Sequence, residues 1–302
     1  MAQPAYPDRP VRLVVPFIAG GSVDILNRVF ARALGQQLGQ PVVVENRPGG
    51  TTSIGTAFVA RAAPDGHTLL GGGDSVELNR YLMASLPYDP DRDLVPIQQL
   101  ADVPYLLVLH PSVPVRTLAE LIAHARANPR ALSYASFGVG GGGHLAGELL
   151  CSMAGIEALH VPYPGNPPAL LDVVAGRVSM MFCTIPVAQP ELRSGHVRAL
   201  AVSTAERVKA LPAVPTVSEA GLPGYECAGT MVLYAPSGVA EPIQGRLLAA
   251  TRTALAAPEV AQLLEEQGFV LAPPRDPAAT RAHVREHAAR LSEVIRSAGI
   301  RL

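Results

Sequence analysis

Two glycine-containing segments stand where an apolar run gives way to an amphipathic helix, and both have the features of an anion site. The first, Phe17–Asp24 (FIAGGSVD), follows the β-branched run Val11–Val15. Adjacent glycines allow a tight turn and a close approach of the backbone to a ligand. The free N–H groups and the positive dipole end of the following helix favour a carboxylate. The candidate ligand contacts in this segment are Phe17, Ala19, Gly20, Gly21, Ser22 and Asp24.

Asp24 also has a purely structural interpretation, because a carboxylate in the first turn stabilises a helix N-terminus. Ser22 can likewise either cap the helix or donate to a bound oxygen. The sequence leaves both alternatives open for these two side chains.

The second segment, Ser136–His144 (SFGVGGGGH), formally matches the dinucleotide fingerprint G-x-G-x-x-G. The match is weak because the loop is nearly all glycine, and because Pro162-Tyr163 stand where an acidic residue is expected. No cofactor is therefore expected, and what remains is a second helix N-terminus with backbone donors. The candidate contacts here are Ser136, Phe137, Gly138, Gly140, Gly143 and His144, and later loops add Asp74, Ser75, Tyr163 and Cys183.

The signatures of catalysis are missing from the sequence. It holds no G-x-S-x-G elbow, no phosphate-binding G-x-x-x-x-G-K-[ST] and no H-E-x-x-H. The eight histidines are dispersed without metal-ligand spacing, and His144 and His160 are each more readily structural than catalytic. We therefore expect no catalytic residue, no metal and no enzymatic activity.

Composition narrows the class further. The 302 residues are 48% hydrophobic and 16% charged, with a net charge of −1, so nucleic acid is not an expected partner. No apolar run reaches the roughly 18 residues of a membrane span. The start Met1–Tyr6 leads straight into the first strand, as in a mature exported chain without its signal peptide, although a native cytosolic start is the alternative. Cys151, Cys183 and Cys227 are interpreted as buried small residues, with one disulfide possible.

Apolar runs and amphipathic helices alternate along the chain, which predicts an α/β fold built on parallel sheets. Strands are expected at 11–15, 42–44, 68–70, 106–109, 132–136, 159–161, 179–182, 197–202 and 231–235. Helices are expected at 22–38, 54–63, 118–127, 144–154, 166–175 and 278–298, with two more before the last. In such sheets, ligands bind at the carboxyl ends of the strands. We predict two lobes, residues 1–103 with 227–302 and residues 104–226, whose anion-binding helix ends face each other.

Ordered motifs along the chain resemble the tripartite tricarboxylate transporter substrate-binding family, also called Bug proteins. They are Tyr6–Phe17 with Gly20, Gly21 and Asp24, then Val42–Gly49 (VVVENRPG), Ala62–Gly66 (AAPDG), Leu86–Pro90 (LPYDP), Tyr134–Ser136 with Gly138, His160–Tyr163 (HVPY), Arg198–Val202 (RALAV), Pro215–Val217 and Glu219–Tyr225 (EAGLPGY). Each motif is weak alone, but the ordered set covers nearly the whole chain.

The resemblance implies a periplasmic solute-binding protein with a two-lobed, type II-like fold around a cleft. It implies a small carboxylate as ligand and integral membrane transporter subunits as partners. From the two predicted crossings between the lobes we expect hinge closure on binding, and we expect the chain itself to be a monomer. Recognition in the family relies on backbone N–H groups and water, in agreement with the glycine loops.

Two departures from the family pattern bear on the ligand. The loop Gly140–Gly143 lacks the Ser or Thr often found there, and Cys183 replaces an acid that would meet an amino group. These departures disfavour an amino acid and leave room for a flat or longer acid, either aromatic or dicarboxylic. A sensory protein that presents its ligand to a membrane receptor, or an enzyme on the same scaffold, are the alternative functions.

Overall fold

The computed structural model describes residues 6–302, so the N-terminal residues that suggested a processed export signal lie largely outside the described part. The chain divides into two compact units. Unit 1 comprises residues 1–102, 230–265 and 271–289, and unit 2 comprises residues 103–229, 266–270 and 290–302. Their roles as two lobes that close on a ligand stay a prediction.

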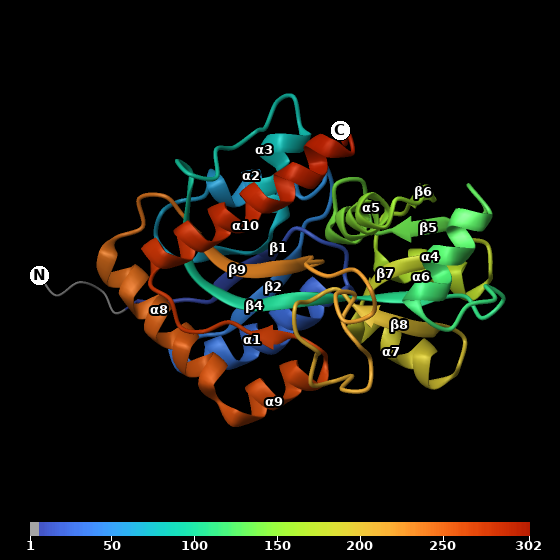
Figure 1. Cartoon of the computed structure of the whole chain (residues 1–302). Helices are drawn as coiled ribbons and strands as arrows, with labels where there is room; N and C mark the ends of the chain where they lie inside the picture. Colours follow the sequence, from blue (N-terminus) through green and yellow to red (C-terminus); the bar gives the residue numbers. More distant parts are fainter. Residues whose placement is uncertain (1–5) are drawn as a thin grey trace, which may run out of the picture. The chain divides into compact units, whose positions relative to one another are not determined.

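Unit 1 is built on strands β1, β2, β3 and β9 (Figure 1). Their bounds are Val11–Val15 for β1, Val42–Asn46 for β2, Thr68–Gly73 for β3 and Ala228–Pro236 for β9. The sheet order is β2-β1-β3-β9. Strand β1 pairs in parallel with both β2 and β3, while β9 is antiparallel to β3. The carboxyl ends of β1, β2 and β3 therefore share one edge of the sheet.

Helices cover both faces of this sheet. Successive side chains of each strand point to opposite faces, so the apolar residues of one strand pack against helices on both sides. Helix α1 (Ser22–Leu38) packs on one face beside α8 (Glu241–Ala256), and α2 (Ser53–Ala60) and α3 (Ser75–Leu82) lie on the other (Figure 1). Val14 and Leu70 project toward the second face, where one cluster joins them to Val59, Val76 and Val284. Helices α9 (Pro258–Glu266) and α10 (Pro277–Ser297) complete the C-terminal part of the chain.

Unit 2 has the same parallel core. Strand β5 (Ser133–Ser136) pairs in parallel with β6 (Leu159–Pro162) and with β7 (Met180–Thr184). Two antiparallel neighbours extend the sheet: the end of β4 (Leu94–Leu109) pairs with both β7 and β8 (Arg198–Val202). Four helices surround this sheet, α4 (Leu118–Ala127), α5 (Gly142–Ala154), α6 (Asn166–Val174) and α7 (Ile185–Arg193).

The predicted α/β class is confirmed, and four elements were missed wholly or in part. Helix α3 was expected to be loop, helix α7 was not predicted, and only the last residues of the 16-residue strand β4 were recognised. Prolines explain two of these misses. Pro186 and Pro190 lie within α7, and Pro96 and Pro104 lie within β4, where proline normally argues against a central strand. The short strand β10 (Val270–Leu271), which pairs with β4, was also not expected.

A glycine on β3 is required for helix α1 to pack against the sheet. A Cβ atom built on Gly71 would lie 2.0 Å from Oδ1 of Asn27, which is fully buried on α1 and donates to the Val23 carbonyl. We expect Gly71→Ala to lower the free energy of unfolding by about 1–3 kcal/mol, because a packed core does not absorb an added methyl group.

Urea unfolding measures this effect, and Gly245→Ala is the matched control. Gly245 lies within α8 with open space around its Cα, so alanine there is expected to be neutral or slightly stabilising. Equal unfolding free energies for the two variants would contradict the packing argument.

Candidate functional site: glycine loops at the carboxyl ends of parallel strands

In unit 1, the loop after β1 presents a helix N-terminus without a side-chain cap. Gly20 has a φ of +80°, which L-residues with side chains rarely adopt, and Gly21 is the N-cap residue of α1. Ala19 and Gly20 are exposed, Phe17 is partly buried, and Ser22 is buried as the first residue of the helix. The backbone N–H groups of the first helical turn are therefore the donors that this loop offers to an anion.

Asp24 acts as the internal anchor of this loop. Its carboxylate accepts hydrogen bonds from the Gly20 N–H, from Arg28 Nε and from Asn46 Nδ2, each at 2.9 Å. Asn46 Nδ2 also lies 3.1 Å from the Phe17 carbonyl oxygen. Burial opposes ionisation of Asp24, but the hydrogen bonds from Arg28, Gly20 and Asn46 outweigh it and lower its pKa. The structure thus favours the structural interpretation of Asp24.

Asp74 and Ser75 begin helix α3 at the end of β3. Burial, partly offset by hydrogen bonds from the backbone N–H groups of Asp74 and Thr230, raises the pKa of Asp74 to about 6. The Ser75 hydroxyl accepts a hydrogen bond of 2.9 Å from Thr52 Oγ1. Both predicted residues therefore lie at the same sheet edge as the glycine loop after β1.

At the junction between β2 and α2, the sequence predicted a turn but no part of the site. Gly49, Gly50, Thr51 and Thr52 all have positive φ values, and those of the two threonines are +48° and +73°. A β-branched residue in this region is a genuine conformational outlier. Asn79 stabilises it by donating to the Thr51 carbonyl over 2.7 Å. The only sequence signal was the turn Arg47–Gly50, which does not reveal the strain in the residues that follow.

In unit 2, the loop after β5 is shaped by glycine and by two aromatic rings. Gly138 and Gly140 have φ values of +137° and +72°, and the Gly141 N–H bonds to the Gly138 carbonyl over 3.1 Å. The rings of Tyr105 and Phe137 lie 5.8 Å apart between their centroids. Helix α5 begins at Gly142 with Gly141 as its N-cap, so this helix N-terminus also lacks a side-chain cap.

Packing explains why Gly142 and Gly143 carry no side chains. A Cβ atom on Gly142 would lie 1.9 Å from the Tyr105 hydroxyl oxygen, and one on Gly143 would lie 2.7 Å from the Phe182 carbonyl oxygen. The expectation that these glycines leave room for a larger acid therefore does not hold at these two positions, because atoms of the chain itself fill the space.

Beneath the glycine loop lies a polar cluster centred on two stacked imidazoles. The rings of His144 and His160 are 3.7 Å apart and nearly parallel. The Gly140 N–H donates to His144 Nδ1 over 3.0 Å, and His160 Nε2 lies 2.7 Å from Ser136 Oγ. Ser136 Oγ in turn contacts the N–H and the carbonyl of Gly138. Ser136 and His144, both predicted site residues, therefore support the loop from below.

Tyr163 follows strand β6, whereas Cys183 lies within strand β7, and the two side chains differ in exposure. Tyr163 is partly buried, and its hydroxyl donates to Asp172 over 2.6 Å. Cys183 is fully buried in an apolar cluster with Leu106, Met181 and Ile185, and burial raises the pKa of its thiol. The thiol of Cys183 is part of the core of unit 2, which argues against direct contact with a ligand.

The hydroxyl of Thr184 is an additional candidate that sequence reasoning missed. Thr184 is the N-cap residue of α7 and is 2% exposed, and its Oγ1 has no hydrogen-bond partner among the described residues. Its backbone N–H lies 3.4 Å from Oδ1 of Asn166, the first residue of α6. The sequence around it, Cys183-Thr184-Ile185, gives no signal that this hydroxyl is buried.

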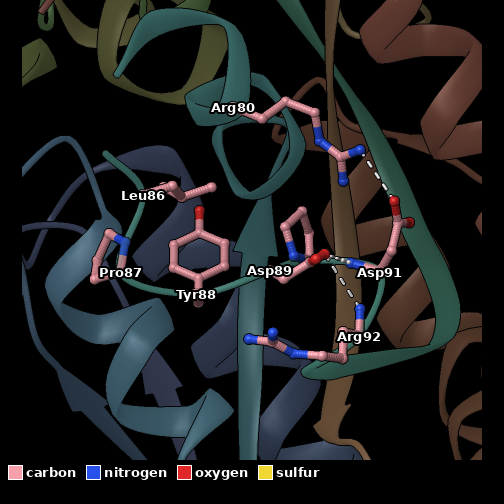
Figure 2. Close-up of a pocket in the computed structure, with 8 residues that line it drawn as sticks. Arg80, Leu86, Pro87, Tyr88, Asp89, Asp91 and Arg92 are labelled. Carbon is pink, nitrogen blue, oxygen red and sulfur yellow. Dashed lines mark hydrogen bonds and ion pairs between the residues drawn. The ribbon is translucent and has the colours of Figure 1, made fainter. Parts of the chain in front are cut away.

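A separate cavity of about 520 Å³ lies in unit 1 along the segment Leu86–Arg92 (Figure 2). Its cationic side chains already have anionic partners. Arg80 pairs with Glu77 at 2.8 Å and with Asp91 at 3.0 Å, and Arg92 pairs with Asp93 at 2.6 Å. These ion pairs make the cavity a weaker carboxylate site than the glycine loops.

Two further findings concern residues 6–302. Within this range, no group of three or more His, Cys, Asp or Glu side chains is arranged to hold a metal ion. None of the helices in the same range combines the length and the apolar character that a membrane span requires.

The fold is similar to that of the solved structure of periplasmic binding protein BugD, with a TM-score of 0.90 and 32% identity over 98% of this chain and 99% of that one. The chain belongs to the tripartite tricarboxylate transporter family receptor family, whose model matches residues 26–300. This agrees with the family resemblance inferred from the sequence motifs.

Individual relatives support the assignment. The chain is 37% identical to Protein BugT of Bordetella pertussis over 98% of its own length and 91% of that protein. It is similar to the solved structure of R. palustris Rpa4515 with adipate, with a TM-score of 0.93 and 37% identity over 98% of this chain and 99% of that one. It is also similar to MatC from Rhodopseudomonas palustris with bound malate, with a TM-score of 0.87 and 34% identity over 96% and 100% of the two chains.

Proposed function

We propose that this protein is a periplasmic solute-binding protein that captures a small dicarboxylate and delivers it to the integral membrane subunits of a tripartite transporter. The observation that carries the proposal is the pair of glycine loops, Phe17–Ser22 and Phe137–Gly143, each of which opens an uncapped helix N-terminus. Two structurally similar proteins hold dicarboxylates, adipate in one and malate in the other.

Backbone donors are sufficient for such a ligand. A micromolar dissociation constant corresponds to about −8 kcal/mol. A hydrogen bond to a charged group contributes roughly 1.5–3 kcal/mol net, so several such bonds reach this value even after the cost of ordering the ligand. The proposal therefore needs no arginine in either loop, and neither loop contains one.

Hydrogen bonds within the chain hold both loops in place, so the backbone donors are already positioned before the ligand binds. Asp24 fixes the first loop through three hydrogen bonds, and the His144–Ser136 cluster fixes the second. Donors that are held in place before binding lose less conformational entropy when the ligand arrives. Because Cys183 is buried in the core of unit 2, the preference for a dicarboxylate over an amino acid rests on the similar structures that hold adipate and malate.

Thermal unfolding in the presence of defined acids tests this proposal. At one hundred times its dissociation constant, a ligand adds about 2.7 kcal/mol to the free energy of unfolding, which is an easily measured shift. We expect adipate or malate to stabilise the protein, and hexanoate, aspartate and benzoate to have a smaller effect at the same concentration. Stabilisation by benzoate alone would mean that the ligand is an aromatic acid and not a dicarboxylate. If no acid raised the unfolding temperature, the proposed function would be contradicted.

A further inference from the structure

The geometry points to a proton-sensitive lock on the glycine loop of unit 2. We propose that His144 holds this loop in its binding-ready form only while its Nδ1 atom is unprotonated. The stacked ring of His160 stays neutral, so that the proton is taken up by His144. This inference rests on the proposed function of the loop, and it adds a positioning residue and a pH dependence.

The first step of the argument is the direction of one hydrogen bond. The Gly140 N–H is a donor, so the Nδ1 atom that it meets at 3.0 Å must be an acceptor. In a neutral imidazole with an acceptor at Nδ1, the proton is on Nε2. Protonation of Nδ1 would place two N–H groups against each other and break the bond. The bond and the charged form of His144 therefore exclude one another.

The second step is the place of Gly140 in the loop. Its φ of +72° and the Gly141-to-Gly138 hydrogen bond define the turn that leads into the first residues of α5. Those residues supply the N–H groups proposed to meet the carboxylate. Loss of the bond from Gly140 to His144 would remove the side-chain contact of Gly140, the middle of this turn, and would leave the Gly141-to-Gly138 bond and the contacts of Ser136 with Gly138 to hold the loop.

The third step concerns which imidazole takes the proton. Burial, together with the neighbouring His144, lowers the pKa of His160 to about 4. His160 therefore stays neutral across the range of about pH 5–8 in which histidine commonly titrates. The parallel stack at 3.7 Å also disfavours two positive charges at once.

The fourth step is a partner for the charged form. His144 Nε2 lies 3.7 Å from Oε1 of Glu148, one turn further along α5, and Glu148 accepts a hydrogen bond from the Tyr134 hydroxyl. Glu148 thus stabilises an imidazolium at His144 once the bond to Gly140 is lost. The cluster has two arrangements, a neutral one that holds the loop and a charged one that pairs with Glu148.

The other titratable groups around His144 do not change this assignment. Burial and the charge of Glu148 raise the pKa values of Tyr134 and of Cys151, so both remain neutral. The groups that face His144 and its helix from the packed elements are Glu148 and Cys151 on α5, Tyr134 on β5, His160 on β6, Tyr105 on β4 and Tyr225, whose hydroxyl bonds to the Ala146 carbonyl.

The variant that separates charge from shape is His144→Asn. The Oδ1 atom of asparagine takes the position of Nδ1, so it accepts from Gly140 but does not gain a proton. His144→Ala removes the acceptor altogether. A merely structural role for His144 would make His144→Ala more damaging than His144→Asn at every pH and would not produce a pH profile in the wild type.

The first measurement uses the ligand-free protein. Amide hydrogen exchange by NMR gives the protection factor of Gly140 at pH 8 and pH 5, corrected for intrinsic exchange. In the wild type we expect protection to fall by about tenfold or more between these values, and in His144→Asn we expect it to stay within about twofold. Constant protection of Gly140 in the wild type would overturn the proposal even if the variant does not fold.

The second measurement is calorimetric titration with adipate and with malate at the same two pH values. Adipate and malate themselves take up protons between these pH values, and this affects the wild type and His144→Asn equally. The informative quantity is therefore the affinity of the wild type divided by that of His144→Asn at each pH. We expect the wild type to lose about tenfold more affinity than His144→Asn on acidification. Equal losses of affinity in the two proteins would refute the role of His144 but leave the proposed function intact. A pH-dependent protection of Gly140 without binding of either acid would refute the proposed function but leave the role of His144.

Discussion

Replacing Asp24 by alanine is expected to lower the free energy of unfolding by about 3 kcal/mol, because it removes the common acceptor of three hydrogen bonds at the first glycine loop. Arg28 is half-exposed, so its guanidinium is hydrated by water once Asp24 is removed. The expected loss of stability is therefore at the lower end of the range for breaking a buried ion pair. We also expect dicarboxylate binding to weaken by about tenfold or more, since Gly20 and Phe17 lose their anchor.

Urea unfolding and calorimetric titration at neutral pH measure the two effects, and Glu241→Ala is the control. Glu241 is an exposed acid in the first turn of α8, so its removal should cost less than about 1 kcal/mol. A loss in Asp24→Ala no larger than in this control would show that the carboxylate contributes only through the helix dipole.

The pH dependence of the Asp24 variant has a definite sign. The hydrogen bonds lower the pKa of Asp24 in the folded protein, so its stabilising effect is complete above the unfolded value of about 3.9 and is lost as the pH falls through the folded value. The difference in stability between wild type and Asp24→Ala should therefore shrink at acidic pH. A difference that stays constant down to pH 2 would mean that the carboxylate charge plays no part.

Local patterns were enough to predict the parts of the fold that depend on neighbouring residues. Helix α1 was predicted with its observed bounds because its apolar residues recur at three- and four-residue steps and glycine residues flank it. Strand β1 was predicted because β-branched residues dominate it and Pro16 ends it. The glycine loop after β1 followed from these two elements.

Features that depend on distant contacts could not be predicted in this way. Asp24 is anchored by Asn46, which is 22 residues away, and no spacing rule connects them. The stacking of His144 on His160 likewise needs α5 and β6 to lie side by side. The sequence offered these residues only as isolated polar positions, and the parallel sheet is what brings them together.

The glycine run Gly140–Gly143 illustrates the limit most clearly. Its sequence suggested empty space for a ligand, whereas the structure assigns different roles to three of the four glycines. Gly140 adopts a positive φ, Gly142 makes room for Tyr105, and Gly143 lies against the backbone of β7. Composition reveals that side chains are missing at these positions but does not reveal what takes their place.

The close approach of Gly143 to the backbone of β7 predicts a large effect of replacing this glycine by alanine. In Gly143→Ala, the new methyl group would lie 2.6 Å from Phe137 Cε1 and 2.7 Å from the Phe182 carbonyl oxygen. Phe182 is paired with Leu107 in the sheet and cannot retreat, so the first turn of α5 must move away from β7. We expect unfolding to become easier by about 1–3 kcal/mol and dicarboxylate binding to weaken by about a hundredfold, because backbone donors act only at hydrogen-bond distance.

Gly141→Ala is the control for this variant, because it adds the same methyl group two residues earlier in the same loop. Its Cβ atom would lie 3.2 Å from the Gly138 carbonyl oxygen and 3.3 Å from the Phe137 ring, contacts that a shift of a few tenths of an ångström relieves. Calorimetric titration with adipate or malate should therefore rank wild type, Gly141→Ala and Gly143→Ala in order of decreasing affinity. If Gly143→Ala were destabilised but bound the acid as well as Gly141→Ala, the first turn of α5 would be a packing element, and the carboxylate donors would have to lie elsewhere in the loop.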